Sequence, residues 1–328
     1  MGGPSIESSS MRSYYSRKER EESWSRVTRA EQVFRETRMR DEFNPAIMKL
    51  PREACDSAKS PHSRGVIFAD DVTGSMGRFL LSLIKDEFPR LITQTYESVS
   101  FDPHIMFMGV GDVAAGDKAP LQVTQFETDL RMLEQLEKIW LEKGGGSNPY
   151  ESYILPWYFA AKHTKMDCFE KRGEKGFLFT FGDEEPTPKL TEYQIDCVFG
   201  GRDSLQEREI SAEKCLAMAS EKFYCYHVIL HGSHYEWYSD ITIQKWRDLM
   251  RTHVCDLSDH HYLPELVSTI FKMYEGMSKT DALNTIQSDR ARHVVEDALK
   301  WHEEHVSDEP THNTDSEDED IEVGFEVL

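Results

Sequence analysis

Carboxylate and hydroxyl side chains gather in residues 68–77, which read Phe-Ala-Asp-Asp-Val-Thr-Gly-Ser-Met-Gly. Asp71, Thr73 and Ser75 occupy alternate positions of this stretch. Their oxygen atoms are hard donors, the kind of ligand that Mg²⁺ prefers, at about 2.0–2.1 Å. The pattern therefore indicates a site for a hard divalent cation.

The surrounding residues predict where this stretch lies in the fold. Residues 66–69, Val-Ile-Phe-Ala, form an apolar run without polar alternation, which is typical of a strand buried on both faces. The apolar residues that follow recur at the three- and four-residue spacing of a helix; they are Phe79, Leu80, Leu83, Ile84, Phe88 and Leu91. The acidic stretch is thus predicted at the carboxyl end of a central strand, where open α/β sheets bind ligands. The alternative is that its polar side chains cap the following helix, whose dipole favours negative charge.

Further apolar runs predict the rest of the sheet. We expect buried strands at residues 105–110, 177–181, 223–230 and 254–257, and a half-exposed antiparallel edge strand at residues 121–126. Helical periods separate these runs, with Thr128 as the predicted cap of one helix. Further helices are expected at residues 149–161, 207–219, 241–250, 264–277 and 280–306. Strands that alternate with helices predict an α/β fold with a doubly wound, mostly parallel central sheet.

Asp71, Thr73 and Ser75, set between this strand and this helix, resemble the metal-ion-dependent adhesion site of von Willebrand factor A (vWA) domains. The resemblance covers about residues 61–278 and implies a Rossmann-like vWA fold. In that family two further loops complete the site. The resemblance places Ser147 where the family has a threonine after a Gly-Gly pair, with Asn148 or Glu151 as alternatives. It places Asp183, after the strand at 177–181, as the ligand of the third loop.

The resemblance implies a Mg²⁺ or Mn²⁺ site formed by Asp71, Thr73, Ser75, Ser147 and Asp183. It also implies a protein–protein interaction module, in which a partner's Asp or Glu carboxylate completes the metal coordination. Intracellular proteins of the family commonly work beside AAA+ ATPases, so such an ATPase is one partner class that the resemblance implies. A scaffold of the same fold without metal is a further alternative.

A Mg²⁺-dependent hydrolase of the haloacid dehalogenase type is the enzymatic alternative. Such enzymes need a second Asp two residues after the nucleophilic Asp, as general acid. Counting from Asp71 that position holds Thr73, which does not transfer protons near neutral pH, and counting from Asp70 it holds Val72. We therefore expect no enzymatic activity.

Charge and composition exclude several other classes. The chain has 328 residues and a formal net charge of −21, of which residues 307–328 carry −9 and residues 1–50 carry +2. A main body without a basic stripe disfavours nucleic-acid binding. The sequence has no run of about 18 apolar residues, as a membrane-spanning helix requires. Residues 1–6 lack the apolar segment of a secretory signal, and the six cysteines form no Cys-x-x-Cys pair, so we expect a cytoplasmic protein with reduced thiols.

The predicted organisation has four parts. Residues 1–60 form an N-terminal extension, unstructured to residue 15 and then a charged helix at 16–40 that lies on the domain or mediates self-association. Residues 61–278 form the α/β domain, residues 279–306 a C-terminal helix, and residues 307–328 a disordered acidic tail.

Some other polar residues are predicted to lie outside the site. We expect Asp70 to point away from Asp71 and to be solvated or salt-bridged, and Glu184 and Glu185 to be exposed. His227 falls inside an apolar strand, and the spacing of the histidines His227, His231, His234, His260 and His261 matches no zinc pattern, so no zinc site is expected.

Overall fold

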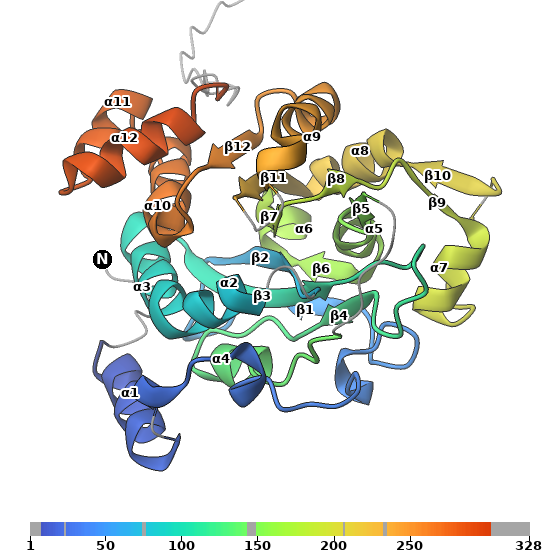
Figure 1. Cartoon of the computed structure of the whole chain (residues 1–328), viewed down its shortest axis with the longest axis horizontal. Coiled ribbons are helices and arrows are strands. Elements are labelled where there is room, and N and C mark those ends of the chain that lie inside the picture. Colours follow the sequence, from blue (N-terminus) through green and yellow to red (C-terminus); the bar gives the residue numbers. More distant parts are fainter. Residues whose placement is uncertain are drawn as a thin grey trace, which may run out of the picture.

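The central sheet of the computed structural model is mixed and mostly parallel. The structure describes residues 8–22, 24–73, 77–142, 149–205, 207–231 and 235–302. In this part of the chain the sheet has six strands in the order β12-β11-β7-β2-β3-β4, and β4 is antiparallel to β3 at one edge (Figure 1). The prediction of an α/β fold with an antiparallel edge strand is confirmed at this level.

The strands and helices have the following bounds. The strands are β1 Arg52–Ala54, β2 Ser63–Asp71, β3 Asp102–Val110, β4 Leu121–Val123, β5 Tyr150–Glu151, β6 Thr164–Met166, β7 Gly176–Gly182, β8 Glu185–Pro186, β9 Lys189–Thr191, β10 Glu209–Ser211, β11 Phe223–Leu230 and β12 Val254–Leu257. The helices are α1 Ser8–Glu22, α2 Gly77–Ser82, α3 Phe88–Ser98, α4 Arg131–Leu136, α5 Ile154–His163, α6 Asp167–Arg172, α7 Glu192–Phe199, α8 Ala212–Lys222, α9 Tyr235–Met250, α10 Leu263–Tyr274, α11 Lys279–Asn284 and α12 Asp289–Ala298. None of these described helices is long and apolar enough to cross a membrane.

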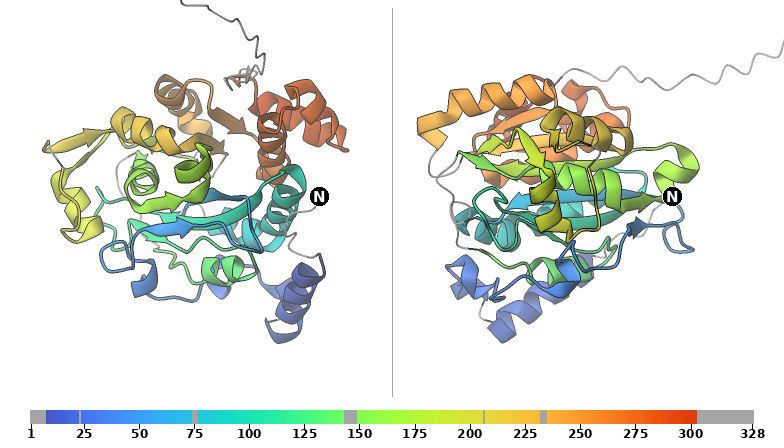
Figure 2. Two further views of the ribbon diagram at one scale, coloured as in Figure 1. Left: turned by 180° about the vertical axis from the view of Figure 1, so that it is seen from behind. Right: turned by 90° about the vertical axis from the view of Figure 1, so that its right-hand side faces the viewer.

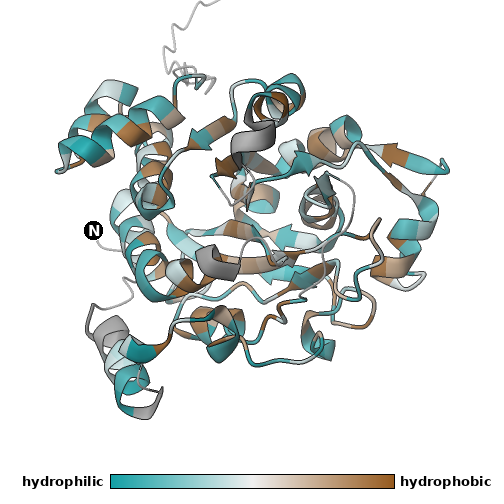
Figure 3. Ribbon diagram, viewed as in Figure 1, coloured by the Kyte–Doolittle hydropathy of each residue, from teal (hydrophilic) through white to brown (hydrophobic). Residues whose placement is uncertain are grey.

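Each face of the sheet has its own hydrophobic core. Side chains alternate along a strand, so Phe68 of β2 joins one core with α3 and α10, and Ile67 joins the other core with α5 and α8. Helices lie on both sides of the sheet (Figure 2), and hydrophobic residues concentrate in its strands (Figure 3). The two-sided burial explains why the central strands are continuous apolar runs.

The edge strand differs from its prediction. Residues 121–126 were expected to be half exposed, but every residue of β4 is buried. The polar side chain of Gln122 is satisfied internally, because its amide donates to the carbonyl of Trp140 at 2.8 Å and its oxygen accepts from the Trp140 N–H at 2.9 Å. The predicted cap at Thr128 is also wrong, since α4 begins at Arg131 after Leu130.

The N-terminal extension is helical earlier than predicted. Helix α1 spans Ser8–Glu22, so the predictions of an unstructured segment to residue 15 and of a helix at 16–40 are wrong at these bounds. Its buried Tyr14 and Lys18 both bond to Glu137 just after α4, which holds the helix against the domain surface. The predicted acidic tail, residues 307–328, lies outside the described residues.

The long helix after β2 is interrupted. A π-helical turn, Leu83–Glu87, separates α2 from α3. Such turns insert one residue per turn and are frequent at functional sites. The turn brings Glu87 into a fully buried position.

Candidate functional site

Acidic residues follow three neighbouring strands of the sheet. Asp71 is the last residue of β2, Asp183 comes directly after β7, and Asp112 comes two residues after β3. Because β2 lies between β3 and β7 in parallel register, these ends meet at one edge. All three carboxylates are buried. We call this group, together with Glu151, the carboxyl-edge site.

Hydrogen bonds fix the orientation of Asp71. Its Oδ1 accepts from the N–H of Thr73 at 2.8 Å and from the Thr73 hydroxyl at 2.6 Å. Its Oδ2 accepts from the Tyr153 hydroxyl at 3.1 Å. Burial, with a further contribution from the charge of Asp183, raises the pKa of Asp71 to about 7 although these hydrogen bonds lower it. Asp71 is thus poised between its charged and neutral forms near neutral pH.

Tyr153 packs directly against the backbone of β7. A Cβ atom at Gly182 would lie 1.9 Å from the Tyr153 hydroxyl oxygen, so this position accepts no side chain. The same hydroxyl accepts from the N–H of Glu184 at 3.4 Å while it donates to Asp71. Tyr153 therefore ties the ends of β2 and β7 together. The sequence interpretation missed it, and the glycine immediately before Asp183 is the signal that could have suggested a close approach.

Glu151 adds a fourth buried acid. It lies in β5, which pairs in parallel with β8 beside the end of β7. Its Oε2 is buried and has no hydrogen-bond partner within the described residues. Burial, followed by the charges of Asp71, Asp112, Asp117 and Glu184, raises the pKa of Glu151 to about 10. Without a bound cation, Glu151 is therefore protonated at neutral pH.

The structure brings together part of the predicted ligand set. Asp71, Thr73 and Asp183 meet at the carboxyl edge. Ser75 and Ser147 lie outside the described residues.

Asp70 and Glu185, which were predicted to be solvated or exposed, are both buried. Asp70 does lie on the opposite face from Asp71, but it is buried, and neither carboxylate oxygen has a hydrogen-bond partner among the described residues, so the solvated or salt-bridged role is wrong. Burial and the charge of Asp71 raise its pKa well above the ordinary value. Glu185 is buried too and forms an ion pair with Lys245, whereas Glu184 is half-buried, so the prediction that both are exposed is wrong.

His227 is a core residue, as the sequence predicted. It is fully buried, its Nδ1 lies 2.8 Å from the Thr180 hydroxyl, and its ring stacks on Trp246 with centroids 3.4 Å apart. Burial lowers its pKa well below the ordinary value. His227 is thus neutral and structural.

The donor set of the carboxyl-edge site fits a hard cation with few protein ligands. At the carboxyl-edge site, no three carboxylate or imidazole ligand atoms of the described residues lie within 4.8 Å of one another. Among the described residues, such a group is formed by Glu87, His260 and His261 instead. Mg²⁺ does not need three, because it keeps several waters and is commonly held by one or two carboxylates. Asp71 and Asp183 supply two carboxylates, and Glu151, whose pKa is raised in part by the charge of Asp71, has an Oε2 without a hydrogen-bond partner within the described residues.

Comparisons with known proteins identify no family. No family model matches the chain, and no curated protein matches it. Among solved structures, it is similar to the pilus adhesin SpaC of Lactobacillus rhamnosus GG in an open conformation, with 8% identity, a TM-score of 0.45, and coverage of 67% of this chain and 31% of that chain. A second crystal form of the same adhesin gives 9% identity, a TM-score of 0.39, and coverage of 74% and 32%. The chain thus spans about a third of the adhesin chains it resembles.

These findings overturn the family assignment made from the sequence. The matched structures are described as pilus adhesin and no family model supports a vWA domain, so the vWA identification and the adhesion-site description of Asp71, Thr73 and Ser75 are wrong. The prediction of an interaction module in which a metal bridges to a partner's carboxylate depended on that family and is wrong for the same reason. The haloacid dehalogenase alternative has no support from any comparison either.

Proposed function

We propose that this protein binds one divalent cation, Mg²⁺ or Mn²⁺, at the carboxyl edge of its central sheet. Asp71 and Asp183 are the anionic ligands, Thr73 contributes its hydroxyl, and Glu151 takes part directly or through water. The bound ion supplies the positive charge that holds these strand ends together.

The observation that carries the proposal is the burial of several acids against one another. Asp71 and Glu151 both have raised pKa values because burial and neighbouring acids disfavour their charged forms. A buried charge without a partner is strongly unfavourable, and a cation removes that penalty for several carboxylates together. A cation therefore displaces protons when it binds.

The proposal is tested by titrating Mg²⁺ into the protein in an isothermal calorimeter. The wild-type chain should take up one ion per molecule and release protons, which is measured by repeating the titration in buffers of different ionisation enthalpy. Asp71→Asn keeps an acceptor for Thr73 but removes the charge, so its Mg²⁺ affinity should fall by at least about 10-fold, equivalent to about 1.4 kcal/mol.

Asp70→Asn is the matched control, because Asp70 is the adjacent residue of β2, carries the same charge and lies on the other face. It should change Mg²⁺ affinity less than Asp71→Asn does. Equal affinity in the wild type and Asp71→Asn would rule out the proposed site.

We also propose that the protein works in a reducing compartment such as the cytoplasm. All six cysteines are free, and Cys215, Cys225 and Cys255 are buried with pKa values raised to about 12, which fits unreactive structural thiols. Thiol labelling of the folded protein should reach Cys55 and Cys197, which are exposed, and not the buried cysteines.

A further inference from the structure

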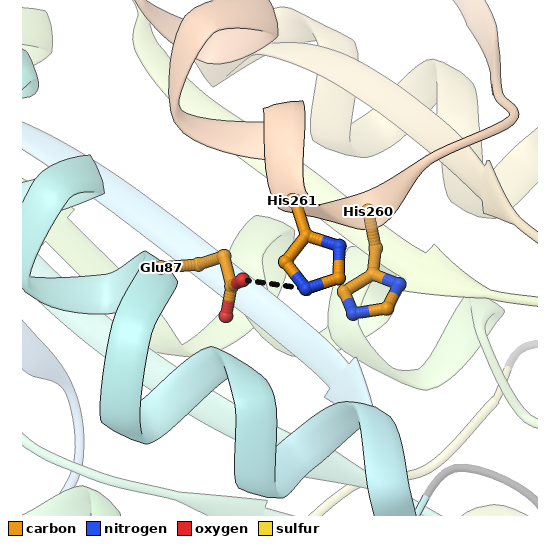
Figure 4. Close-up of side chains that lie close together, drawn as sticks. All are labelled: Glu87, His260 and His261. Carbon is orange, nitrogen blue, oxygen red and sulfur yellow. Dashed lines mark ion pairs between the residues drawn. The ribbon is translucent and has the colours of Figure 1, made fainter.

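Three metal-ligating side chains outside the carboxyl-edge site meet where the helix that follows β2 faces the turn that follows β12. Glu87 ends the π-helical turn before α3, and His260 and His261 form the short 3₁₀ turn before α10. Their ligand atoms all lie within 4.8 Å of one another. In Figure 4 the Glu87 carboxylate points from its helix toward the two imidazole rings. We call this group the Glu–His–His site.

The carboxylate of Glu87 is buried and only partly satisfied. Its side chain is 1% exposed. Its Oε1 accepts from the Ser82 hydroxyl at 3.1 Å, whereas its Oε2 has no hydrogen-bond partner in the part of the chain that the structure describes. A buried acceptor without a partner is costly, so this atom is expected to have a ligand.

The spacing within the group is that of two ligands on one ion. The Nε2 of His261 lies 3.8 Å from Oε1 of Glu87, which is too long for a hydrogen bond. Two ligands at about 2.1 Å from a tetrahedral ion lie about 3.4 Å apart, so a shift of a few tenths of an ångström closes them on a metal. The His261 side chain is 58% exposed, and its ring stacks on that of His260 with centroids 4.2 Å apart, so the two imidazoles lie together beside the Glu87 carboxylate and can make such a shift at the surface.

Asp259 orients His261 in the way that metal-binding histidines are oriented. The Nδ1 of His261 lies 2.8 Å from Oδ1 of Asp259, which leaves Nε2 directed at Glu87. Arg290 in turn lies 3.1 Å from Oδ2 of Asp259. A carboxylate on the far ring nitrogen fixes the tautomer and strengthens the metal–nitrogen bond.

We propose that Glu87, His260 and His261 bind Zn²⁺. Two imidazole nitrogens with one carboxylate are a donor set that suits zinc, and three protein ligands leave a fourth position open for water or another ligand. The nitrogen donors distinguish this site from the carboxyl-edge site, whose oxygen donors favour Mg²⁺. The π-helical turn has a role in this arrangement, because it sets Glu87 opposite the histidines.

The test is a competition between the full-length protein and a chromophoric zinc chelator, with Mg²⁺ in excess to fill the carboxyl-edge site. The wild-type protein should bind one Zn²⁺. Glu87→Gln and His261→Ala should each weaken Zn²⁺ binding by more than about 100-fold, because each removes a direct ligand. Asp259→Asn should weaken it by about 10–100-fold, the usual effect of losing the residue that orients a ligand.

His293→Ala is the matched control, since His293 is an exposed histidine of α12 paired with an acid, Glu296, as His261 is paired with Asp259. It should bind Zn²⁺ as the wild type does. Wild-type protein that takes up no Zn²⁺, Glu87→Gln that binds as tightly as the wild type, or an equal loss in His293→Ala would each overturn the proposal. The test remains decisive even if Glu87→Gln does not fold. The side chain of His261 is exposed, so His261→Ala is expected to fold.

Discussion

The carboxyl-edge site and the Glu–His–His site are assembled in opposite ways. The first gathers residues at the ends of neighbouring parallel strands, where sheet register alone brings Asp71 and Asp183 together. The second joins a helix interior to a turn more than 170 residues later in the chain, and depends on the packing of α3 against α10. That packing includes the Arg90–Glu265 ion pair and the hydroxyl pair Ser98–Ser268 at 2.6 Å. Strand topology builds the first site, and helix packing builds the second.

The electrostatics of the two sites differ as well. At the carboxyl edge, acids face acids, and the pKa values of Asp71 and Glu151 rise. In the Glu–His–His site an acid faces imidazoles, and the charge of His261 counteracts part of the rise that burial causes in the pKa of Glu87. Without a cation, the acids of the first site therefore oppose one another's ionisation, whereas in the second site the charge of His261 offsets part of the cost of burying the Glu87 carboxylate.

Gly182→Ala should have the largest effect on stability. A Cβ at this position would lie 1.9 Å from the Tyr153 hydroxyl oxygen and would separate Tyr153 from Asp71. Overpacking and the lost hydrogen bond together should destabilise the fold by about 3–5 kcal/mol, or about 4–7 °C in Tm. Thermal unfolding followed by circular dichroism measures this.

Gly116→Ala is the comparison for that variant. Gly116 has φ +84°, and a Cβ added there would meet no atom within 4 Å, so only the left-handed backbone opposes the change, by about 1–2 kcal/mol. Similar Tm values for the two variants would contradict the close contact at Gly182.

Tyr153→Phe should have the next largest effect. It removes the hydroxyl that donates to Asp71 Oδ2 and leaves a buried carboxylate oxygen with one donor fewer. The expected loss is about 1.5–3 kcal/mol in denaturant unfolding. Tyr193→Phe, at a 75% exposed position, should stay within about 0.5 kcal/mol of the wild type. A Tyr153→Phe variant as stable as the wild type would show that the hydroxyl does not join the strand ends.

His261→Ala should have the smallest effect in metal-free protein. Its side chain is mostly exposed, and its pairing with Asp259 is at the surface, so less than about 1 kcal/mol is expected. In saturating Zn²⁺ the difference from the wild type should grow, because the metal stabilises the wild type alone. Urea unfolding with and without Zn²⁺ separates the two cases. A large loss in metal-free protein would mean that the Glu–His–His site is a structural contact.

The sheet could be predicted from the sequence because its strands are unbroken apolar runs between polar turns. The bounds of β11 and β12 agree with their predictions for that reason. Helix α7 was missed, because it is short, although Thr191 and Gln194 form a capping box that marks its start. The bounds of α1 were missed as well. Its residues are mostly polar, and the helix is held in place by the bonds of Tyr14 and Lys18 to Glu137, which the sequence does not reveal.

The two sites differ in how much of each the sequence could reveal. Asp71 was found because an acid at the end of a buried strand points to the ligand-binding edge of a sheet, whereas Asp183 was placed beside it only by the resemblance to a vWA domain. Tyr153 was not found, since its role needs the packing of its ring beneath Gly182. Glu87 was not connected with His260 and His261 either, because nothing in local spacing joins residues so far apart. The histidine pair alone matched no zinc pattern, and the third ligand is provided by the fold.

The central claim is that the acids of the carboxyl edge require a cation, and the pH dependence of Tm tests it most directly. The pKa of Asp71 is raised from 3.8 to about 7, so without cation the folded state holds a proton that the unfolded state has lost, and stability falls as pH rises through this interval. Glu151, raised to about 10, extends the fall to higher pH.

The measurement compares Tm in chelator and in Mg²⁺ at about pH 8, above the Asp71 pKa of about 7. With Mg²⁺ at 100 times its Kd, the wild-type Tm should rise by about 4 °C, which corresponds to about 2.7 kcal/mol in a chain of this length. The rise should shrink toward low pH and be largely absent in Asp71→Asn. A wild-type Tm that is the same in chelator and Mg²⁺, or that rises with pH in chelator through this interval, would contradict the account.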